Sequence, residues 1–287
     1  MIPRSPLYSI GRRARLPEDL RVGIGAGGHT ATVSAERLPL VVVPCYNEER
    51  RLDPARLGPL ASSGRLHLLF VDDGSTDGTA AVLGGLRDTV DGVEVLTLPG
   101  NVGKAEAIRR GLVQGIETGA PIVGYYDADL ATPPEELVRM VDLLQGRRDL
   151  EFVLSARVAL LGRHIRRRAT RHYLGRVFAT FASLTLHIPV YDTQCGAKVL
   201  RASPAVRAAV AHPFRSSWVF DVELIGRLLR GTGGAEPVPL AAFEEMPLLE
   251  WRDISGSRLR IRDMARAFAD LLAVAIRLHR PNARRKD

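Results

Sequence analysis

Residues 123–130 of the chain read Val-Gly-Tyr-Tyr-Asp-Ala-Asp-Leu, an apolar run that ends in two aspartates two positions apart. Such a run predicts a buried strand, and side chains at i and i+2 of a strand point to the same face. Asp127 and Asp129 would then lie together at the carboxyl end of a strand, where open α/β sheets bind ligands. Two carboxylates at one point suit Mg²⁺ or Mn²⁺, which also bind substrate phosphates. The alternative is an ordinary surface turn.

Three more apolar runs precede this stretch, at residues 38–43, 66–71 and 93–98, and each is followed by polar residues. The segments between them are compatible with helices. A Pro-Pro-Glu-Glu sequence at 133–136 opens another helix, since helix starts favour proline and acids. Strands that alternate with helices form βαβ units. We therefore predict an α/β fold, a Rossmann-like, mostly parallel sheet flanked by helices.

The polar residues after these strands should lie together, because the carboxyl ends of parallel strands share one edge of the sheet. Acids after the first two strands can bind a base or a ribose, as they do in dinucleotide folds. A divalent ion on the aspartate pair could bridge a diphosphate and neutralise it as it leaves. There is no Gly-x-x-x-x-Gly-Lys-Ser/Thr loop, so P-loop ATP hydrolysis is not expected. The residues expected at this crevice are Asn47, Glu48, Asp72, Asp73, Lys104, Asp127 and Asp129.

Composition restricts the partners and the compartment. The 287 residues carry a formal charge of +8, which favours anionic partners such as nucleotides, lipid phosphates or nucleic acid. Cys45 and Cys195 lie far apart and outside any Cys-x-x-Cys pair, so we expect a reducing compartment and no zinc site. We find neither an apolar window of about eighteen residues nor an apolar signal core. We therefore expect a cytoplasmic protein, soluble or peripheral on the cytoplasmic face of a membrane.

The two ends of the chain are expected to lie outside the folded domain. Residues 1–37 are rich in Arg, Gly and Pro and predict a flexible leader, 38–280 a single domain and 281–287 a basic tail. The leader contains Gly-Ile-Gly-Ala-Gly-Gly at 23–28, which matches the dinucleotide fingerprint as a string. That fingerprint needs a strand before it and a helix after it, and neither is indicated. A flexible glycine loop is therefore favoured.

The alternation of strands and helices stops after Ser155. Residues 163–171 contain five arginines. They form either a solvated helix face or a contact with an acceptor or a membrane, where each basic residue contributes about 1 kcal/mol. Residues 258–279 are amphipathic, and we expect their apolar stripe to pack on the domain rather than on lipid. We expect Trp218 and Trp251 to be packing residues.

Several motifs resemble those of the family 2 glycosyltransferases, which have the GT-A fold. In the first half they are Pro-Cys-Tyr-Asn-Glu at 44–48, Asp-Asp-Gly-Ser at 72–75, Asn-Val-Gly-Lys at 101–104 and Asp-Ala-Asp at 127–129. In the second half, the motifs at 155–157, 192–196, 218–223 and 251–259 are similar to the dolichyl-phosphate β-glucosyltransferase branch, within the polyprenyl-phosphate glycosyltransferases. The resemblance covers roughly residues 38 to 279. It implies a nucleotide-sugar half at 38–156 and an acceptor half at 157–280, with a C-terminal helical extension on the acceptor side.

The resemblance also implies roles for single residues. Asp127 and Asp129 would hold Mg²⁺ or Mn²⁺ together with the diphosphate. The residues implied in catalysis are Asp129, Asp221 and Arg157. The residues implied in nucleotide binding are Pro44, Tyr46, Asn47, Glu48, Asp73, Lys104 and Asp127. Those implied at the acceptor phosphate and the sugar are Arg157, Arg168, Gln194 and Lys198.

Two positions depart from the family pattern. Ala105 stands where relatives commonly have glycine, and Ala197 stands where an aromatic residue is usual, so the sugar or acceptor pocket can differ from that of the family. We also find no counterpart of the N-terminal membrane anchor of eukaryotic relatives. A soluble acceptor therefore stays open.

These observations lead to one main hypothesis. The chain would be an inverting glycosyltransferase that moves a hexose to a polyprenyl or dolichyl phosphate. The favoured donor is UDP-glucose, with a related nucleotide sugar as the alternative. A phosphate acceptor is already a nucleophile near neutral pH, whereas a hydroxyl acceptor would need a base, for which Asp221 is the candidate. The alternatives are a transferase with a soluble small-molecule acceptor, a catalytically silent nucleotide-sugar-binding or membrane-associated scaffold, and a nucleotidyltransferase, whose phosphate loop is missing. No nucleic-acid partner is expected, and the oligomeric state is not predicted.

Overall fold

The computed structural model describes residues 37–166, 169–254 and 261–279. The predicted leader with its glycine string, the predicted acceptor residue Arg168, residues 255–259 of the last motif and the basic tail lie outside these described residues. The first half of the described chain contains β1 Leu40–Cys45, α1 Pro54–Ala61, β2 His67–Asp72, α2 Thr79–Thr89, β3 Val93–Thr97, α3 Lys104–Glu117, β4 Ile122–Tyr126, α4 Pro134–Gly146 and β5 Phe152–Ala156. The second half contains β6 His164–Arg166, α5 Ala169–Leu186, β7 Ala197–Arg201, α6 Pro204–Val210, α7 Phe220–Arg230, a 3₁₀ turn Leu240–Ala242, β8 Phe243–Pro247, β9 Glu250–Arg252 and α8 Ile261–His279.

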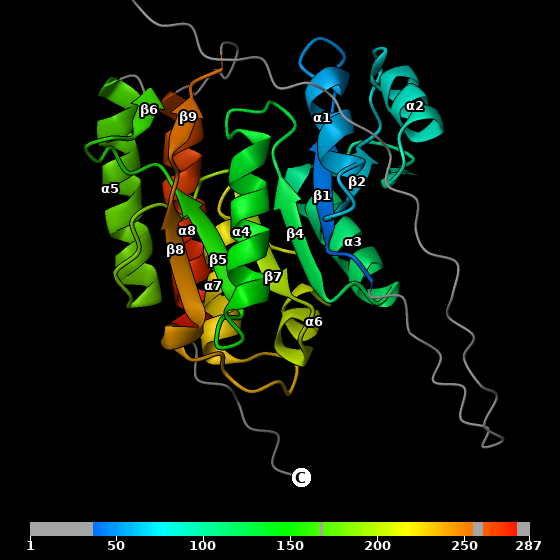
Figure 1. The fold of residues 1–287 in the computed structure, drawn as a ribbon. Coiled ribbons are helices and arrows are strands. Elements are labelled where there is room, and N and C mark those ends of the chain that lie inside the picture. The colour runs from blue at the N-terminus through cyan, green and yellow to red at the C-terminus, as the bar shows by residue number, and fades with distance from the viewer. Residues whose placement is uncertain (1–36, 167–168, 255–260, 280–287) are drawn as a thin grey trace, which may run out of the picture. The chain divides into compact units, whose positions relative to one another are not determined.

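The central sheet has the strand order β3-β2-β1-β4-β7-β5-β8. Every strand runs parallel to its neighbours except β7, which pairs antiparallel with β4 and with β5. Helices cover both faces of the sheet (Figure 1). The predicted fold class, a mostly parallel sheet flanked by helices with a helical extension in the second half, is confirmed.

The core lies on both sides of the sheet because the central strands are apolar on both faces. Along β1, Leu40 and Val42 pack against α3, whereas Val41 and Val43 pack in the opposite cluster with α1, α2 and α4. This alternation follows from the two-residue period of a strand. A strand buried on both faces reads as a continuous apolar run, which is the pattern that predicts it from the sequence.

Helix α3 packs very closely against the sheet, and this positions its first residue at the sheet edge. A Cβ atom at Gly111 would lie 2.6 Å from Cγ1 of Val42, so only glycine allows this approach. The helix begins at Lys104, directly after Gly103, whose φ of 91° favours glycine. Lys104 therefore stands beside the carboxyl ends of β1 and β4.

The second half adds elements around the same edge. Strand β7 enters between β4 and β5, so that Ala197 pairs with Tyr126 at the end of β4. Strands β6 and β9 form a separate two-stranded sheet. Helices α5 and α8 pack on each other through Phe178, Phe181 and Phe268.

The helices of the described chain are too short or too polar to span a bilayer. The long amphipathic helix predicted near the C-terminus is α8, and its buried residues Leu271 and Val274 belong to the main core. Its apolar stripe packs on the domain, as expected from its spacing.

Candidate active site

Two hollows open at the carboxyl edge of the sheet. The smaller, of about 320 Å³, lies over the ends of β1 and β2, and the larger, of about 790 Å³, reaches from the end of β4 to α5, α7 and α8. Lys104, Asp127 and Asp129 line both of them. Of the other residues predicted to bind the nucleotide, the smaller hollow is lined by Pro44, Tyr46, Glu48 and Asp73.

Asn47 joins two loops and is not among the residues that line the smaller hollow. Its backbone has a φ of 54°, and its N–H donates to Ser75 Oγ at 3.0 Å. Its Oδ1 accepts a hydrogen bond from the N–H of Thr76 at 2.8 Å. The N–H of Glu48 donates to Thr79 Oγ1 at 2.8 Å in a similar way. These hydrogen bonds join the loop after β1 to the loop after β2.

Asp73 is buried, and its carboxylate binds the backbone of a neighbouring loop. Its two carboxylate oxygens accept hydrogen bonds from the N–H groups of Val102, at 2.7 Å, and Gly103, at 2.8 Å. These bonds fix the loop that leads into α3. The carboxylate predicted to bind the nucleoside therefore lines the hollow and, in addition, sets the position of Lys104.

Asp127 is held by the segment that precedes β7. Its N–H donates to the carbonyl oxygen of Gly196 at 2.9 Å. A Cβ atom at position 196 would overlap the Asp127 carboxylate, so a larger residue there would displace that side chain. Asp127 Oδ1 lies 2.6 Å from Nζ of Lys104. Burial lowers the pKa of Lys104, but the charge of Asp127 outweighs that effect and raises the pKa.

The acids around this pair carry negative charge that the fold does not fully neutralise. Burial raises the pKa of Asp129, and the neighbouring charge of Asp127 raises it further. Burial also raises the pKa of Glu48, to which Asp129 and Asp127 contribute. Among the described residues, Glu48 Oε2 is buried and no donor reaches it. A cation at this point would relieve the repulsion.

The donor set suits a magnesium- or manganese-type ion that is shared with a ligand. No three His, Cys, Asp or Glu side chains of the described residues converge closely enough to hold an ion alone. Ions of this type bind through one or two carboxylates and complete their shell with phosphate and water oxygens. Asp127 and Asp129 therefore fit a cation that arrives with a diphosphate.

Arg157 lies in the larger cavity, where its guanidinium is held by a neighbour. Its Nε and Nη2 donate to the two oxygens of Asp192 at 2.6 and 2.8 Å, and the guanidinium lies over the ring of Trp251. Burial lowers the pKa of Arg157, but the charge of Asp192 outweighs it and the pKa is raised. The predicted acceptor residue thus presents a permanently charged, rigid group.

Asp221 lies in the first turn of α7 and belongs to a buried polar network. Lys198 Nζ lies 2.7 Å from its Oδ1, and the hydroxyl of Tyr125 donates to the same oxygen. Gln194 Nε2 donates to the other oxygen at 3.4 Å. Lys198 is fully buried, and its ammonium also donates to the carbonyl oxygen of Cys195 at 2.6 Å. Gln194 and Asp221 line the cavity, whereas Lys198 lies beneath them.

The far side of the larger cavity is apolar. Leu174, Phe178 and Ala179 of α5 and Ala267 and Phe268 of α8 line it. Sequence reasoning missed these residues, because an apolar stripe at helical spacing indicates a core face first. In the folded structure, some apolar residues of α5 and of α8 face the cavity instead of the core, and only the packing of the two helices shows this.

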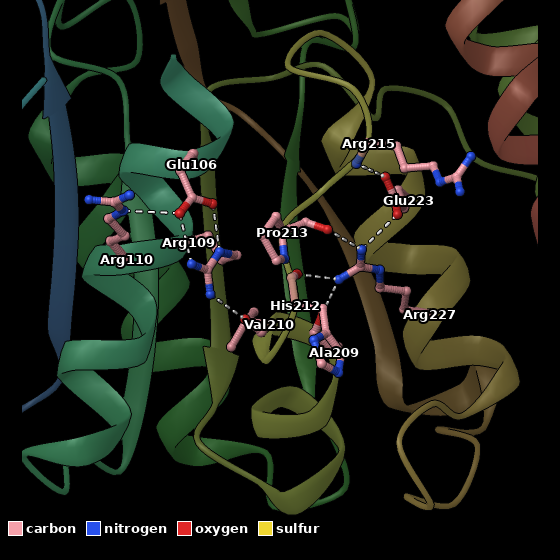
Figure 2. A network of polar contacts seen from close by, with 10 residues as sticks. All are labelled: Glu106, Arg109, Arg110, Ala209, Val210, His212, Pro213, Arg215, Glu223 and Arg227. Atoms are coloured by element: carbon pink, nitrogen blue, oxygen red, sulfur yellow. Dashed lines mark hydrogen bonds and ion pairs between the residues drawn. The ribbon is translucent and has the colours of Figure 1, made fainter. Parts of the chain in front are cut away.

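A loop between α6 and α7 closes another side of the cavity with Ser217 and Trp218. We expected Trp218 to be a packing residue, but it is 41% exposed, whereas Trp251 is buried as expected. Figure 2 shows the polar contacts between the first residues of this loop and α7. Arg227 donates to the carbonyl oxygens of His212 and Pro213, and Glu223 accepts from the N–H of Arg215.

The comparisons with known proteins agree with this architecture. The family model described as "Glycosyl transferase family 2" matches residues 40–206. A polyprenol monophosphomannose synthase of Mycolicibacterium smegmatis is 27% identical over 82% of this chain and 88% of its own length. A dolichyl-phosphate beta-glucosyltransferase of Mus musculus is 31% identical over 76% of this chain and 68% of its own length.

A solved structure shows the same fold. Glucosyl-3-phosphoglycerate synthase from Mycobacterium tuberculosis, crystallised with Mn²⁺, UDP-glucose and phosphoglyceric acid, is 20% identical. It aligns with a TM-score of 0.60 over 84% of this chain and 80% of that chain. The resemblance to the polyprenyl-phosphate branch of family 2, predicted from the motifs, is confirmed by the curated relatives. The chain belongs to glycosyl transferase family 2.

Proposed function

We propose that this chain transfers glucose from UDP-glucose to a polyprenyl phosphate, with inversion at the anomeric carbon. The observation that carries the proposal is the junction of the two hollows at Lys104, Asp127 and Asp129. A nucleoside in the smaller hollow and an acceptor in the larger one would meet at these charged groups. The names of the mouse and mycobacterial relatives support glucose or mannose as the sugar and a polyprenyl phosphate as the acceptor.

The reaction replaces the bond between C1 of the sugar and the diphosphate with a bond between C1 and the acceptor. An oxygen of the acceptor phosphate attacks C1 while the bond from C1 to the diphosphate oxygen breaks, and UDP leaves. Mg²⁺ or Mn²⁺ held by Asp127 and Asp129 would supply positive charge for the leaving diphosphate. Tyr46 and Glu48 border the nucleoside, and Lys104 adds a positive charge at the diphosphate. Arg157 attracts the acceptor phosphate.

The charges of the larger cavity favour an acceptor that needs no base. Three of the five described aspartates that line it are already paired with cations: Asp127 with Lys104, Asp192 with Arg157, and Asp221 with Lys198. We assign a fourth, Asp129, to the divalent ion. A general base needs an oxygen that can take a proton from the acceptor. A phosphate acceptor is already ionised near neutral pH. We therefore assign Asp221 a positioning role through Gln194.

The apolar side of the cavity favours a lipid over a small phosphorylated acid. Leu174, Phe178 and Phe268 offer surface that the first isoprene units of a polyprenyl chain would bury. Burial of apolar area contributes about 25 cal/mol per Å². A soluble phosphorylated acid has no group that would use this surface.

We also propose that α5 and α8 bring the cavity to the surface of a membrane. Both helices carry exposed apolar residues, and Arg166, Arg266 and Arg277 are exposed nearby in sequence. Amphipathic helices of this kind lie in the bilayer interface, with arginines that attract anionic lipid. The exposed apolar residues are Tyr173, Leu174, Val177, Phe181, Leu184, Leu272 and Ile276.

A transfer assay tests the proposal. The 287-residue chain is incubated with radiolabelled UDP-glucose, Mn²⁺ and a short-chain polyprenyl phosphate, and the label is measured in the organic phase. Parallel reactions contain 3-phosphoglycerate, GDP-mannose or EDTA. We expect a lipid-linked product with a β anomeric signal by NMR and no product with EDTA.

The other outcomes are distinct. Transfer to 3-phosphoglycerate alone would overturn the lipid acceptor and leave a transferase of soluble substrates. Transfer from GDP-mannose alone would overturn the donor. If UDP-glucose binds but no acceptor receives the label, the chain is a sugar-nucleotide-binding scaffold.

A further inference from the structure

Lys104 pairs with Asp127, one of the two carboxylates proposed to hold the divalent ion. Its Nζ lies 2.6 Å from Asp127 Oδ1, at the shared wall of the two hollows. An ion of the magnesium type binds a carboxylate oxygen at about 2.0–2.1 Å and fills the space around it with further oxygens. An ammonium group and such an ion on one oxygen would repel each other strongly at this distance. The two cations therefore compete for Asp127.

Asp127 does not need Lys104 to keep its position. Its N–H is bound by the carbonyl oxygen of Gly196 at 2.9 Å, and its carboxylate packs directly on that glycine. The ion pair with Lys104 thus neutralises charge rather than orienting the carboxylate. Lys104 could either orient Asp127 for the ion or compete with the ion for Asp127. Removing the lysine would weaken metal binding in the first case and strengthen it in the second.

The side chain of Lys104 can leave Asp127 while its backbone stays in place. The backbone is fixed by the hydrogen bonds from Val102 and Gly103 to Asp73. The side chain is 47% exposed and carries its charge on a flexible stem. Because it also lines the smaller hollow, a diphosphate bound there would give the ammonium a new anionic partner.

We infer that Lys104 is an internal counter-ion, which occupies the Asp127 site in the free protein and moves to the diphosphate when the nucleotide and the ion bind. This inference rests on the metal site of the proposed function. It makes ion binding weak without nucleotide and strong with it, since the nucleotide removes the competing cation. Such coupling is reciprocal, so the ion strengthens nucleotide binding by the same factor.

Mn²⁺ binding to the 287-residue chain tests the inference without any turnover. Free Mn²⁺ is measured by electron paramagnetic resonance in a titration, with and without UDP, for the wild type, Lys104→Met and Arg110→Met. Arg110 lies on the same helix and pairs with Glu106, so its substitution removes one positive charge away from the hollows. Thermal melts check that each variant is folded.

We expect Lys104→Met to bind Mn²⁺ about tenfold more tightly than the wild type when UDP is absent, because a repelling charge is gone. The tightening caused by UDP should shrink in this variant, and UDP itself should bind more weakly. Arg110→Met should match the wild type in every titration.

Two results would overturn the inference in different ways. If folded Lys104→Met binds Mn²⁺ as the wild type does, or less tightly, the lysine orients Asp127 or lies apart from the ion, and the metal site of the proposed function still stands. If neither protein binds Mn²⁺, even with UDP, the metal site itself is wrong and the inference falls with it.

Discussion

Asp127 and Asp129 are neighbours in sequence, but different parts of the molecule determine their surroundings. Asp127 is fixed by Gly196, which belongs to the segment before β7, and its charge is neutralised by Lys104 from the start of α3. Asp129 makes a local turn, in which its Oδ1 accepts a hydrogen bond from the N–H of Ala131 at 3.1 Å. Each residue can therefore be tested by a separate substitution.

Asp129→Asn should preserve the fold and remove most of the transfer activity. Burial and the charge of Asp127 raise the pKa of Asp129, so the folded state disfavours its charged form and the neutral amide should not lower the melting temperature. If Asp129 holds the ion, as proposed, its loss removes several kcal/mol of leaving-group stabilisation, and we expect at least about a hundredfold lower kcat. Steady-state kinetics with Mn²⁺ and a thermal melt measure both. Full activity in the variant would contradict the metal assignment.

Gly196→Ala should disturb the site without unfolding the protein. The added Cβ atom would overlap the Asp127 carboxylate and push it away from Lys104. We expect a loss of Mn²⁺ affinity and of kcat/KM of at least about tenfold. Gly84→Ala on α2 is the matched control, because a Cβ atom there meets nothing within 4 Å. Equal behaviour of the two variants would show that Asp127 tolerates displacement.

Asp221→Asn separates a positioning role from that of a base. The substitution leaves the buried Lys198 without its counter-charge, and breaking such a pair costs about 3–5 kcal/mol of folding free energy. The amide can still contact Tyr125 and Gln194. We expect a lower melting temperature but an unchanged shape of the pH profile of kcat/KM. Disappearance of a limb of that profile, with a loss of 10²–10⁴ in rate, would instead identify Asp221 as a base.

At the scale of elements, two ion-pair clusters hold α6 between its neighbours α3 and α7 (Figure 2). Glu106 binds Arg109 and Arg110 on α3, and Arg109 reaches the carbonyl oxygen of Val210 at the end of α6. Arg227 of α7 reaches the carbonyl oxygen of Ala209 from the other side. The elements behind the cavity are thus tied at helix ends, where carbonyl groups lack helical partners.

Glu106→Gln should destabilise the protein at neutral pH but not in acid. Hydrogen bonds from Arg109 lower the pKa of Glu106, with Arg110 contributing, so the ionised form stabilises the fold. That contribution is present above the pKa of the unfolded carboxyl and is lost as pH falls through the lower pKa of the folded state. We expect a loss of about 1 kcal/mol in the free energy of unfolding at pH 7.

Denaturation in urea at several pH values measures this effect. The difference between wild type and Glu106→Gln should close as the pH approaches the folded pKa of Glu106. Glu117→Gln, at the exposed end of the same helix, serves as the control and should show no such change. If the difference in the free energy of unfolding persists unchanged in acid, the effect of the substitution comes from packing rather than from charge.

At the scale of the whole domain, the apolar side of the cavity reaches the protein surface on α5, and α8 also carries exposed apolar residues. Leu174 of α5 both lines the cavity and is exposed. A soluble monomer rarely exposes an extended apolar surface without a partner for it. The proposed partner is the bilayer that holds the acceptor.

The double substitution Leu184→Glu and Leu272→Glu should weaken binding to anionic lipid vesicles. Burying one leucine contributes about 1.5–3 kcal/mol, so we expect vesicle binding to fall at least about tenfold. Transfer to a detergent-dispersed acceptor should be retained, since neither residue lines the cavity. Leu240→Glu, at another exposed leucine, is the control in a vesicle flotation assay. Unchanged flotation of the double variant would contradict the membrane contact and would indicate another partner for this surface, such as a second copy of the chain.

The amino-acid sequence by itself determined the parallel strands, the acids at their ends and the family, because these follow from local periodicity and from motifs that are contiguous along the chain. The tertiary structure decided the rest. It brought Gly196 against Asp127, buried Lys198 beneath Asp221, joined Arg157 to Asp192, and turned parts of α5 and α8 into a cavity wall. The physical reason is that these contacts join residues far apart in sequence. Burial and pairing in three dimensions set the charge and exposure of each such side chain, and no local pattern records them.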